Sequence, residues 1–119
     1  MSPIVSSPIM RIERELMRGA GPIAVLQLLE TGEKYGYELV KLLERQKRGA
    51  LAMGQSTLYP MLYNLEAKRL VASRLQQTDA GRERKYYRLT ATGKKQLAKS
   101  KQQWQALSAA MGELGVIAT

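Results

Sequence analysis

Two consecutive segments constrain this chain most: an amphipathic helix that leads within a few residues into a basic β-hairpin. The helix is predicted over 55–66, where Leu58, Met61, Leu62 and Leu65 recur at helical spacing. The hairpin is predicted from alternation in 71–78 and 84–90, with turn-forming residues at 79–81. In such a pair the helix can enter a major groove while a cationic hairpin tip reaches phosphates or the minor groove beside it.

The charge distribution favours the same part of the chain. The formal net charge is +9, but residues 1–55 carry eight Lys and Arg against six acids, and residues 56–119 carry eleven against four. Cations gathered around the helix and hairpin suit a polyanionic partner, although a solvated basic surface would give the same count.

The composition excludes several chemistries. Cys and His are both absent, which removes thiolate nucleophiles, disulfides, imidazole catalysis and thiol or imidazole metal sites. The acids are scattered among Lys and Arg, so no enzyme, cofactor or metal site is expected. No apolar run approaches the roughly 18 residues of a membrane span, and the N-terminus is unlike a signal peptide. We expect a cytoplasmic protein.

The N-terminal half reads as a flexible leader followed by helices. Residues 1–8 hold two prolines and several serines. The face of a helix is then marked at three- and four-residue spacing by Ile9, Ile12, Leu16 and Gly19. Gly21-Pro22 predicts a break or kink before a buried helix over 23–29. A second helix is expected over 35–45 and a minor strand over 51–53. Ser56 or Thr57 is expected to cap the next helix, with Pro60 in its first turn.

The last predicted helix, 91–114, has a heptad pattern. Leu97, Trp104 and Met111 are seven residues apart, and Ser100, Leu107 and Leu114 each follow three positions later. The rest of the helix is rich in Lys and Gln, so it has no evident core of its own to cover. A matching helix from a second copy would bury this stripe, which predicts a homodimer.

This order predicts a mainly α fold with a small β-hairpin: a winged helix-turn-helix with a C-terminal dimerisation helix. Three motifs, Tyr35–Leu39, Ser56–Glu66 and Gly81–Thr90, closely resemble those of the PadR family of bacterial transcriptional regulators. The resemblance covers about Leu16 to Leu107, and the single last helix resembles the small subfamily. The expected organisation is a flexible leader (1–8), a DNA-binding domain (9–90), and a dimerisation helix with tail (91–119).

The resemblance implies a dimeric repressor that binds double-stranded DNA and is often released by a small phenolic or drug-like effector. Two residues depart from the family pattern. Arg69 stands where Gly is usual after the recognition helix, and a non-Gly residue there costs about 1 kcal/mol if the backbone is left-handed. Glu83 stands at a wing position that is often basic, which weakens the attraction for phosphate.

Side-chain chemistry selects the candidates for DNA contact. Gln can pair with adenine, hydroxyls and phenols can reach bases or phosphates, and the cations at the hairpin can neutralise phosphates. The structural alternatives are that Ser56 and Thr57 only cap, that one Tyr packs inside, and that the hairpin is solvated. The predicted set is Gln55, Ser56, Thr57, Tyr59, Tyr63, Arg82, Arg84, Lys85 and Tyr37.

The dimer interface is expected to use Leu16, Leu97, Trp104, Leu107, Met111 and Leu114. Trp104 has two interpretations. It packs across the dimer, or it stacks on a flat aromatic effector as a Trp at a similar place does in multidrug-responsive relatives. Ser100 and Ser108 would then line the effector site. The alternative function is a protein that coats RNA or DNA without sequence preference, which would need neither the heptad pattern nor the outward polar set.

Overall fold

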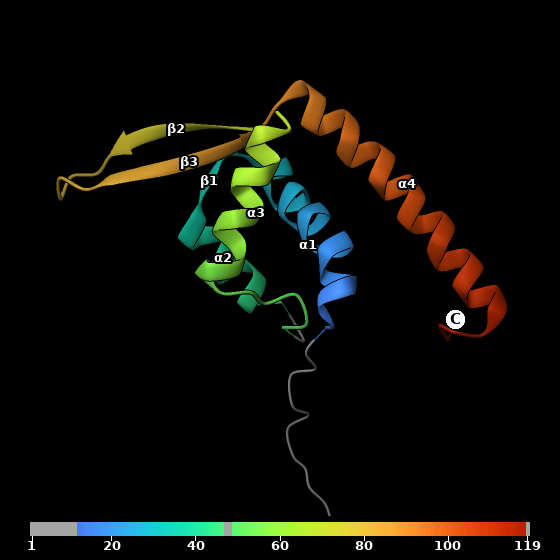
Figure 1. Cartoon of the computed structure of the whole chain (residues 1–119). Helices are drawn as coiled ribbons and strands as arrows, with labels where there is room; N and C mark the ends of the chain where they lie inside the picture. The colour runs from blue at the N-terminus through green and yellow to red at the C-terminus, as the bar shows by residue number, and fades with distance from the viewer. Residues whose placement is uncertain (1–11, 47–48, 119) are drawn as a thin grey trace, which may run out of the picture.

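The computed structural model describes residues 12–46 and 49–118 and has a mainly α fold with a small antiparallel sheet, as predicted (Figure 1). The expected leader, 1–8, lies outside the described residues. The elements in chain order are α1 (Arg14–Leu28), the 3₁₀ turn η1 (Leu29–Thr31), β1 (Lys34–Tyr35), α2 (Gly36–Glu44), α3 (Gln55–Ala67), β2 (Val71–Gln77), β3 (Glu83–Leu89) and α4 (Ala91–Leu114).

The sheet has the order β1-β3-β2, and both pairs are antiparallel. β2 and β3 form the wing, a hairpin that extends away from the helices (Figure 1). The predicted alternation is confirmed, because Tyr87 and Leu89 are buried while Arg88 is exposed. The turn also matches: Gly81 has φ 82°, and its N–H donates to the Thr78 carbonyl at 2.9 Å.

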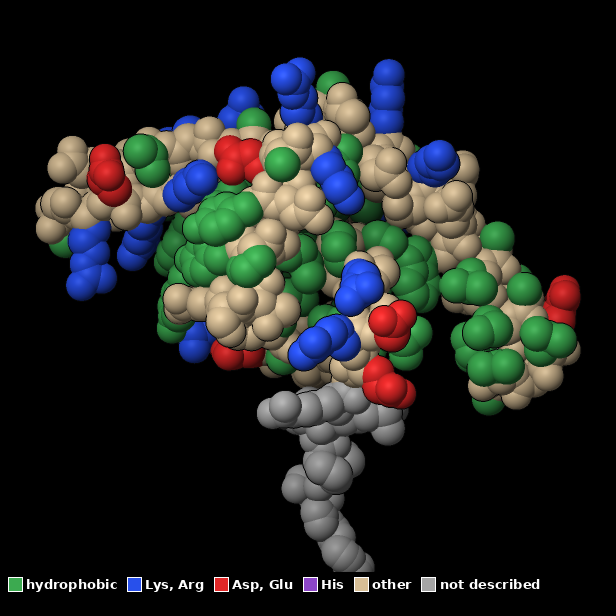
Figure 2. Space-filling model, viewed as in Figure 1, with side chains coloured by type: hydrophobic (Ala, Val, Ile, Leu, Met, Phe, Trp, Pro, Cys, Tyr) green, Lys and Arg blue, Asp and Glu red, His purple; other side chains and the backbone are tan. Residues whose placement is uncertain are grey.

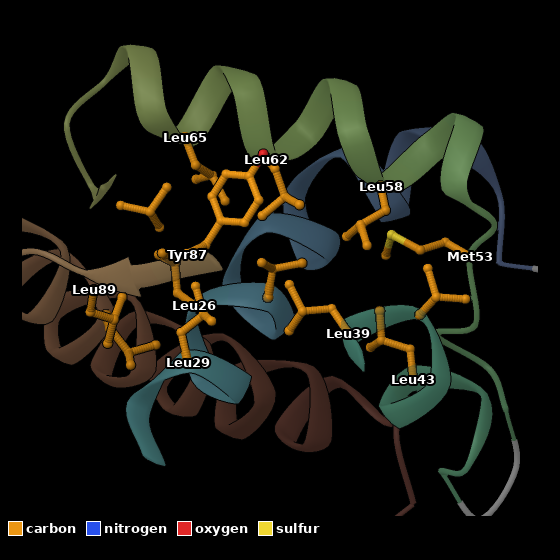
Figure 3. Close-up of a cluster of buried hydrophobic side chains, with 14 residues drawn as sticks. Leu26, Leu29, Leu39, Leu43, Met53, Leu58, Leu62, Leu65, Tyr87 and Leu89 are labelled. Carbon is orange, nitrogen blue, oxygen red and sulfur yellow. The ribbon is translucent and has the colours of Figure 1, made fainter. Parts of the chain in front are cut away.

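One hydrophobic core lies where α1, α2, α3 and the base of β3 meet (Figure 3). The predicted stripe of α3 contributes Leu58, Leu62 and Leu65, all at most 4% exposed. Tyr87 of β3 is fully buried beside them. α3 and the wing are therefore anchored in the same core, while their other faces are exposed to solvent.

The break expected at Gly21-Pro22 is wrong, because α1 runs through both residues. Proline removes one helical hydrogen bond, to the carbonyl four residues earlier, and Arg18 at that position is exposed to solvent. Gly21, Val25 and Leu26 are buried on the core side of α1. Packing on both sides of the proline holds the helix together at the cost of one hydrogen bond.

Three smaller expectations also need correction. No strand forms over 51–53, and the third strand of the sheet is instead β1, two residues that pair with Tyr86 and Tyr87. Gly54 is the N-cap of α3, so neither Ser56 nor Thr57 caps it. Pro60 lies in the second turn of α3 rather than the first, and the helix continues through it.

Arg69 ends α3 in the left-handed conformation, with φ 62°. Its N–H donates to the Glu66 carbonyl at 2.9 Å, and the Leu70 N–H donates to the Leu65 carbonyl at 3.0 Å. These two bonds form a Schellman motif, in which glycine is usual after the C-cap. The chain therefore adopts the glycine geometry with an arginine and accepts its backbone strain.

We call α1, α2, α3 and the sheet the head. α4 begins against the head and then extends away from it (Figure 1). The expectation that this helix covers no core of its own is wrong for its first two turns, since Leu97 is 2% exposed within the single chain. Further along, Lys101 Nζ lies 3.1 Å from Glu30 Oε2 at η1. Among the described helices none is both long and apolar enough to cross a membrane.

Candidate nucleic-acid interface

The first turn of α3 presents polar side chains to solvent. Gln55, Ser56 and Thr57 are all exposed, and the backbone N–H groups of Thr57 and Leu58 donate to the Gly54 carbonyl at 3.1 and 3.0 Å. These are the first hydrogen bonds of the helix, its N-cap is Gly54, and neither hydroxyl caps it. The amide and hydroxyls can therefore serve as donors and acceptors toward a groove.

The two tyrosines of α3 differ in environment. Tyr63 is 55% exposed, whereas Tyr59 is half-buried and packs against the core. A Cβ added to Gly36 would lie 2.5 Å from the Tyr59 hydroxyl oxygen, so the tyrosine occupies the space that the glycine leaves at the start of α2. The rings of Tyr59 and Tyr63 are 6.3 Å apart. Tyr63 is thus the more accessible phenol.

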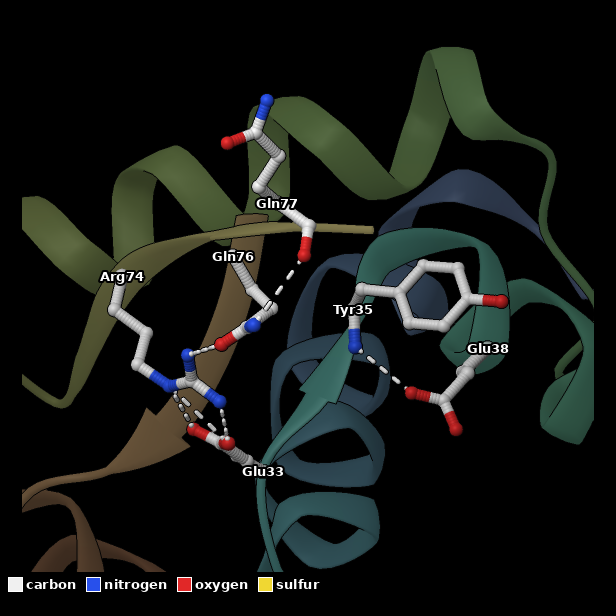
Figure 4. Close-up of polar contacts among 6 residues, drawn as sticks. All are labelled: Glu33, Tyr35, Glu38, Arg74, Gln76 and Gln77. Atoms are coloured by element: carbon white, nitrogen blue, oxygen red, sulfur yellow. Dashed lines mark hydrogen bonds and ion pairs between the residues drawn. The ribbon is translucent and has the colours of Figure 1, made fainter. Parts of the chain in front are cut away.

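The start of α2 is held by a local hydrogen bond, because Glu38 Oε1 accepts from the Tyr35 N–H at 3.1 Å (Figure 4). Tyr37 lies in the same first turn of α2 and is 44% exposed. Lys41 Nζ lies 5.2 Å from the centroid of the Tyr37 ring. The Tyr37 phenol, followed by the charge of Glu44, raises the pKa of Lys41.

Arg82 lies at the tip of the wing. Its N–H donates to Thr78 Oγ1 at 3.2 Å, and its carbonyl accepts from the Thr78 N–H at 2.7 Å, which closes the turn. The Arg82 side chain is exposed and has no ion pair among the described residues. It is the wing cation best placed to reach a phosphate.

Arg74 and Arg84 lie on the face of the sheet that also carries Tyr35 of β1, the strand beside β3. Arg74 forms a bidentate ion pair with Glu33, in which Arg74 Nε lies 3.0 Å from Glu33 Oε2 (Figure 4). Arg84 lies 4.4 Å above the centroid of the Tyr35 ring, and Tyr35 meets Tyr86 edge to face. Hydrogen bonding to Arg74 lowers the pKa of Glu33. Arg84 stays exposed, although its position is set by the Tyr35 ring.

Lys85 lies on the opposite face, toward α3. Its Nζ is 3.4 Å from Glu66 Oε1 and 5.4 Å from the centroid of the Tyr63 ring. Glu66 Oε2 in turn accepts from Ser73 Oγ of β2 at 2.5 Å. The Ser73 hydrogen bond, and then the charge of Lys85, lower the pKa of Glu66. Lys85 therefore has an anionic partner within the chain, unlike Arg82.

The heptad residues of α4 divide into two groups. Leu97 and Ser100 are buried in the single chain, at 2% and 5% exposed, whereas Trp104 and Leu107 are 39% and 50% exposed. Leu114 is 78% exposed, Met111 is half-buried, and Leu16 of α1 is 63% exposed. Figure 2 shows hydrophobic side chains gathered over the C-terminal end of α4. We call Leu16, Trp104, Leu107, Met111 and Leu114 the apolar stripe.

The three residues predicted to line an effector site are not equally accessible. Ser108 is exposed one turn from Trp104, but Ser100 is 5% exposed, and its Oγ accepts from Gln96 Nε2 at 3.1 Å. Trp104 and Ser108 lie together on the open part of α4, whereas Ser100 belongs to the packed part.

Sequence reasoning missed the acids that hold the wing. Glu33 lies 41 residues from Arg74 along the chain, and Glu66 lies 19 residues from Lys85. Short-range helical spacing does not reveal such pairs. The available signal was register, since the hairpin pairs Ser73 with Tyr87 and Leu75 with Lys85, which puts Ser73 and Lys85 on one face of the wing.

The comparisons with known proteins agree with this geometry. The model of the transcriptional regulator PadR-like family matches residues 25–99. A PadR family transcriptional regulator from Eggerthella lenta is 36% identical with a TM-score of 0.74, covering 84% of this chain and 85% of its own. A Streptococcus transcriptional regulator is 29% identical with a TM-score of 0.75, covering 87% and 99% of the two chains.

A PadR-like transcriptional regulator from Bacillus cereus is 28% identical with a TM-score of 0.73, and the match covers 84% of this chain and 95% of that protein. The fold, the wing and the family match agree over most of the chain. Members of this family are transcriptional regulators rather than enzymes. The chain belongs to the PadR-like family of transcriptional regulators.

Proposed function

We propose that the protein is a homodimeric repressor that binds a pseudo-palindromic operator through α3 and the wing. The observation that carries the proposal is the exposed first turn of α3 beside a wing whose tip cation, Arg82, has no acidic partner among the described residues. Gln55, Ser56, Thr57 and Tyr63 would read the major groove, and Arg82 and Arg84 would reach the adjacent backbone or minor groove. Tyr37 would contact a phosphate from the start of α2.

The apolar stripe supports the homodimer. Trp104, Leu107 and Leu114 of α4, and Leu16 of α1, are exposed apolar side chains, and their removal from water would be favourable. Two copies related by a two-fold axis would bury these stripes together and present two recognition helices, which fit half-sites about one DNA turn apart. Bound at a promoter, such a dimer would block transcription by occlusion.

The proposal also includes a small aromatic effector. A flat aromatic molecule that stacks on Trp104 beside Ser108 would change the packing of the two long helices, and so the spacing of the two heads. The buried position of Ser100 favours Trp104 and Ser108 as the contacting residues. Titration of planar aromatics against the fluorescence of Trp104 tests this, since the chain has one Trp.

Selection of bound duplexes from a random oligonucleotide pool tests the main proposal. We expect a two-fold symmetric motif, bound by a dimer, with an affinity that falls steeply as salt rises. Recovery of unrelated sequences with equal affinity for structured RNA would instead identify a protein that coats nucleic acid without preference.

A further inference from the structure

Lys85 is the wing cation whose surroundings agree least with a phosphate contact. Sequence reasoning groups it with Arg82 and Arg84, yet its ammonium lies 3.4 Å from a Glu66 carboxylate oxygen. The same ammonium lies 5.4 and 5.5 Å from the ring centroids of Tyr63 and Tyr87, within the usual range of cation–π contact. A phosphate would have to compete with all three groups.

These contacts join two elements that meet DNA at different places. Glu66 and Tyr63 belong to α3, while Lys85 belongs to β3 of the wing. Ser73 of β2 adds a hydrogen bond of 2.5 Å to the second oxygen of Glu66, so one carboxylate binds both strands of the wing. Lys85 and Glu66 keep 39% and 34% of their side chains exposed, so the cluster lies at the surface, next to the face proposed for DNA.

We infer that Glu66 and Lys85 are positioning residues for DNA recognition: together with Ser73 they fix the wing against α3 and hold the exposed Tyr63 ring in place. The inference rests on the proposed function and deepens it. Major-groove and wing contacts form together only if the angle between the two elements is set, and a wing already held in that angle loses less conformational entropy on binding.

The wing offers a matched control. Glu83 is an exposed acid of β3 and has no ion pair among the described residues. Glu66→Gln and Glu83→Gln each remove one negative charge near the proposed DNA face. If only charge matters, both changes should strengthen DNA binding. If Glu66 positions the wing, Glu66→Gln should weaken DNA binding while Glu83→Gln strengthens it.

The experiment measures binding of the 119-residue chain, as the proposed dimer, to the selected duplex over a range of salt concentrations. We expect Glu66→Gln and Lys85→Met to weaken binding about tenfold with an unchanged salt slope, because ordering rather than a phosphate contact is lost. Arg82→Met should make the negative slope of log K against log salt shallower by about 0.9. Lys85→Arg keeps the ion pair and should restore most of the affinity.

A second measurement needs no DNA. The chain lacks cysteine, so Asn64→Cys and Ala80→Cys allow spin labels on α3 and on the tip of the wing. We expect a narrow distance distribution that broadens in Glu66→Gln and Lys85→Met but not in Glu83→Gln. Circular dichroism and light scattering check that each variant stays folded and dimeric.

The outcomes separate the two proposals. If the wild-type protein selects no duplex, the proposed function fails, and the spin-label distances alone decide the positioning role. Two results would overturn the inference while the proposed function stands, provided that the wild type binds its duplex. One is tighter binding by Glu66→Gln, and the other is a salt dependence of Lys85→Met that is as shallow as that of Arg82→Met.

Discussion

Thr90 Oγ1 donates a hydrogen bond to the main-chain carbonyl of Arg69 at 2.7 Å. The same hydroxyl oxygen accepts from the Gly93 N–H at 2.9 Å and so caps α4. One threonine therefore connects the end of α3 to the start of α4. These hydrogen bonds help to set the direction of α4 relative to α3. In a dimer formed through α4 they would therefore also help to set the relative position of the two α3 helices.

The left-handed Arg69 predicts a stabilising substitution. Arg69→Gly should raise the free energy of unfolding by about 1 kcal/mol, because glycine adopts φ 62° without the clash of a Cβ. Lys68→Gly is the matched control, since Lys68 has φ −81° and glycine there only adds unfolded-state entropy. Urea denaturation measures both, and a loss of stability in Arg69→Gly would contradict the assigned backbone strain.

A substitution at Gly93, in the first turn of α4, should instead lower the free energy of unfolding. A Cβ there would lie 1.9 Å from the Leu70 carbonyl oxygen, a backbone atom that cannot move aside alone. Gly93→Ala should therefore destabilise the protein by roughly 3 kcal/mol or more, as overpacking of a rigid site does. Gly19→Ala in α1 meets nothing within 4 Å and should add about 0.5–1 kcal/mol. Thermal unfolding of the two variants in parallel is the measurement, and equal melting temperatures would refute the close approach.

Tyr87 carries a buried hydroxyl with no hydrogen-bond partner in the described structure. Its ring is fully buried, and burial raises the pKa of the phenol against the opposing effect of the nearby Lys85 charge. Tyr87→Phe removes the unsatisfied group and keeps the packing, so we expect a gain of about 1 kcal/mol in the free energy of unfolding. Tyr87→Leu leaves a cavity and should be destabilising. A clear loss in Tyr87→Phe would reveal a partner for the hydroxyl.

The parts of this fold that sequence could predict are those with a local period. The stripe of Leu58, Leu62 and Leu65 follows from helical spacing, and the burial of Tyr87 and Leu89 follows from alternation. The two-residue β1 has no period to detect, so its place at 34–35 was missed. Pro22 was misread because tertiary packing, which local rules do not contain, holds α1 through it.

The candidate site shows the same division. The polar first turn of α3 and the basic tip of the wing were predicted from residue types at their positions. The sequence did not predict which wing cations are paired, because pairing depends on which of them lies close to an acid in the fold. Arg74, Lys85 and Arg82 look equivalent in the sequence, yet the first two face Glu33 and Glu66 across elements.

Stability should depend on pH in the acid range through the paired glutamates. The pKa of Glu66 is lowered, first by Ser73 and then by Lys85, and that of Glu30 is lowered by Gln27 and Lys101. A folded-state pKa below the ordinary 4.5 means that the stabilisation is present above that value and is lost as the pH falls through the folded pKa.

We therefore expect the free energy of unfolding to fall as the pH is lowered from about 5 toward 3, with a smaller fall in a Glu30→Gln, Glu66→Gln double variant. Urea titrations at several pH values measure this. The side chains of Glu66 and Glu30 are 34% and 49% exposed, so solvent ions reach both pairs and the effect should weaken at high salt. A double variant with the wild-type slope would show that other carboxylates cause the acid sensitivity.

The apolar stripe predicts how the proposed dimer can be broken. Leu107 is 50% exposed in the single chain, and a second copy packed on it would bury it completely. Leu107→Glu would place an unpaired charge in that interface, so the dimer should dissociate at concentrations where the wild type stays paired. Leu75→Glu is the control, because Leu75 is 63% exposed on the wing, away from the stripe. Light scattering over a dilution series measures both variants. A Leu107→Glu protein that remains a dimer while Trp104 fluorescence is unchanged would mean that the two copies meet through another surface, and the spacing of the heads would then have to be set elsewhere.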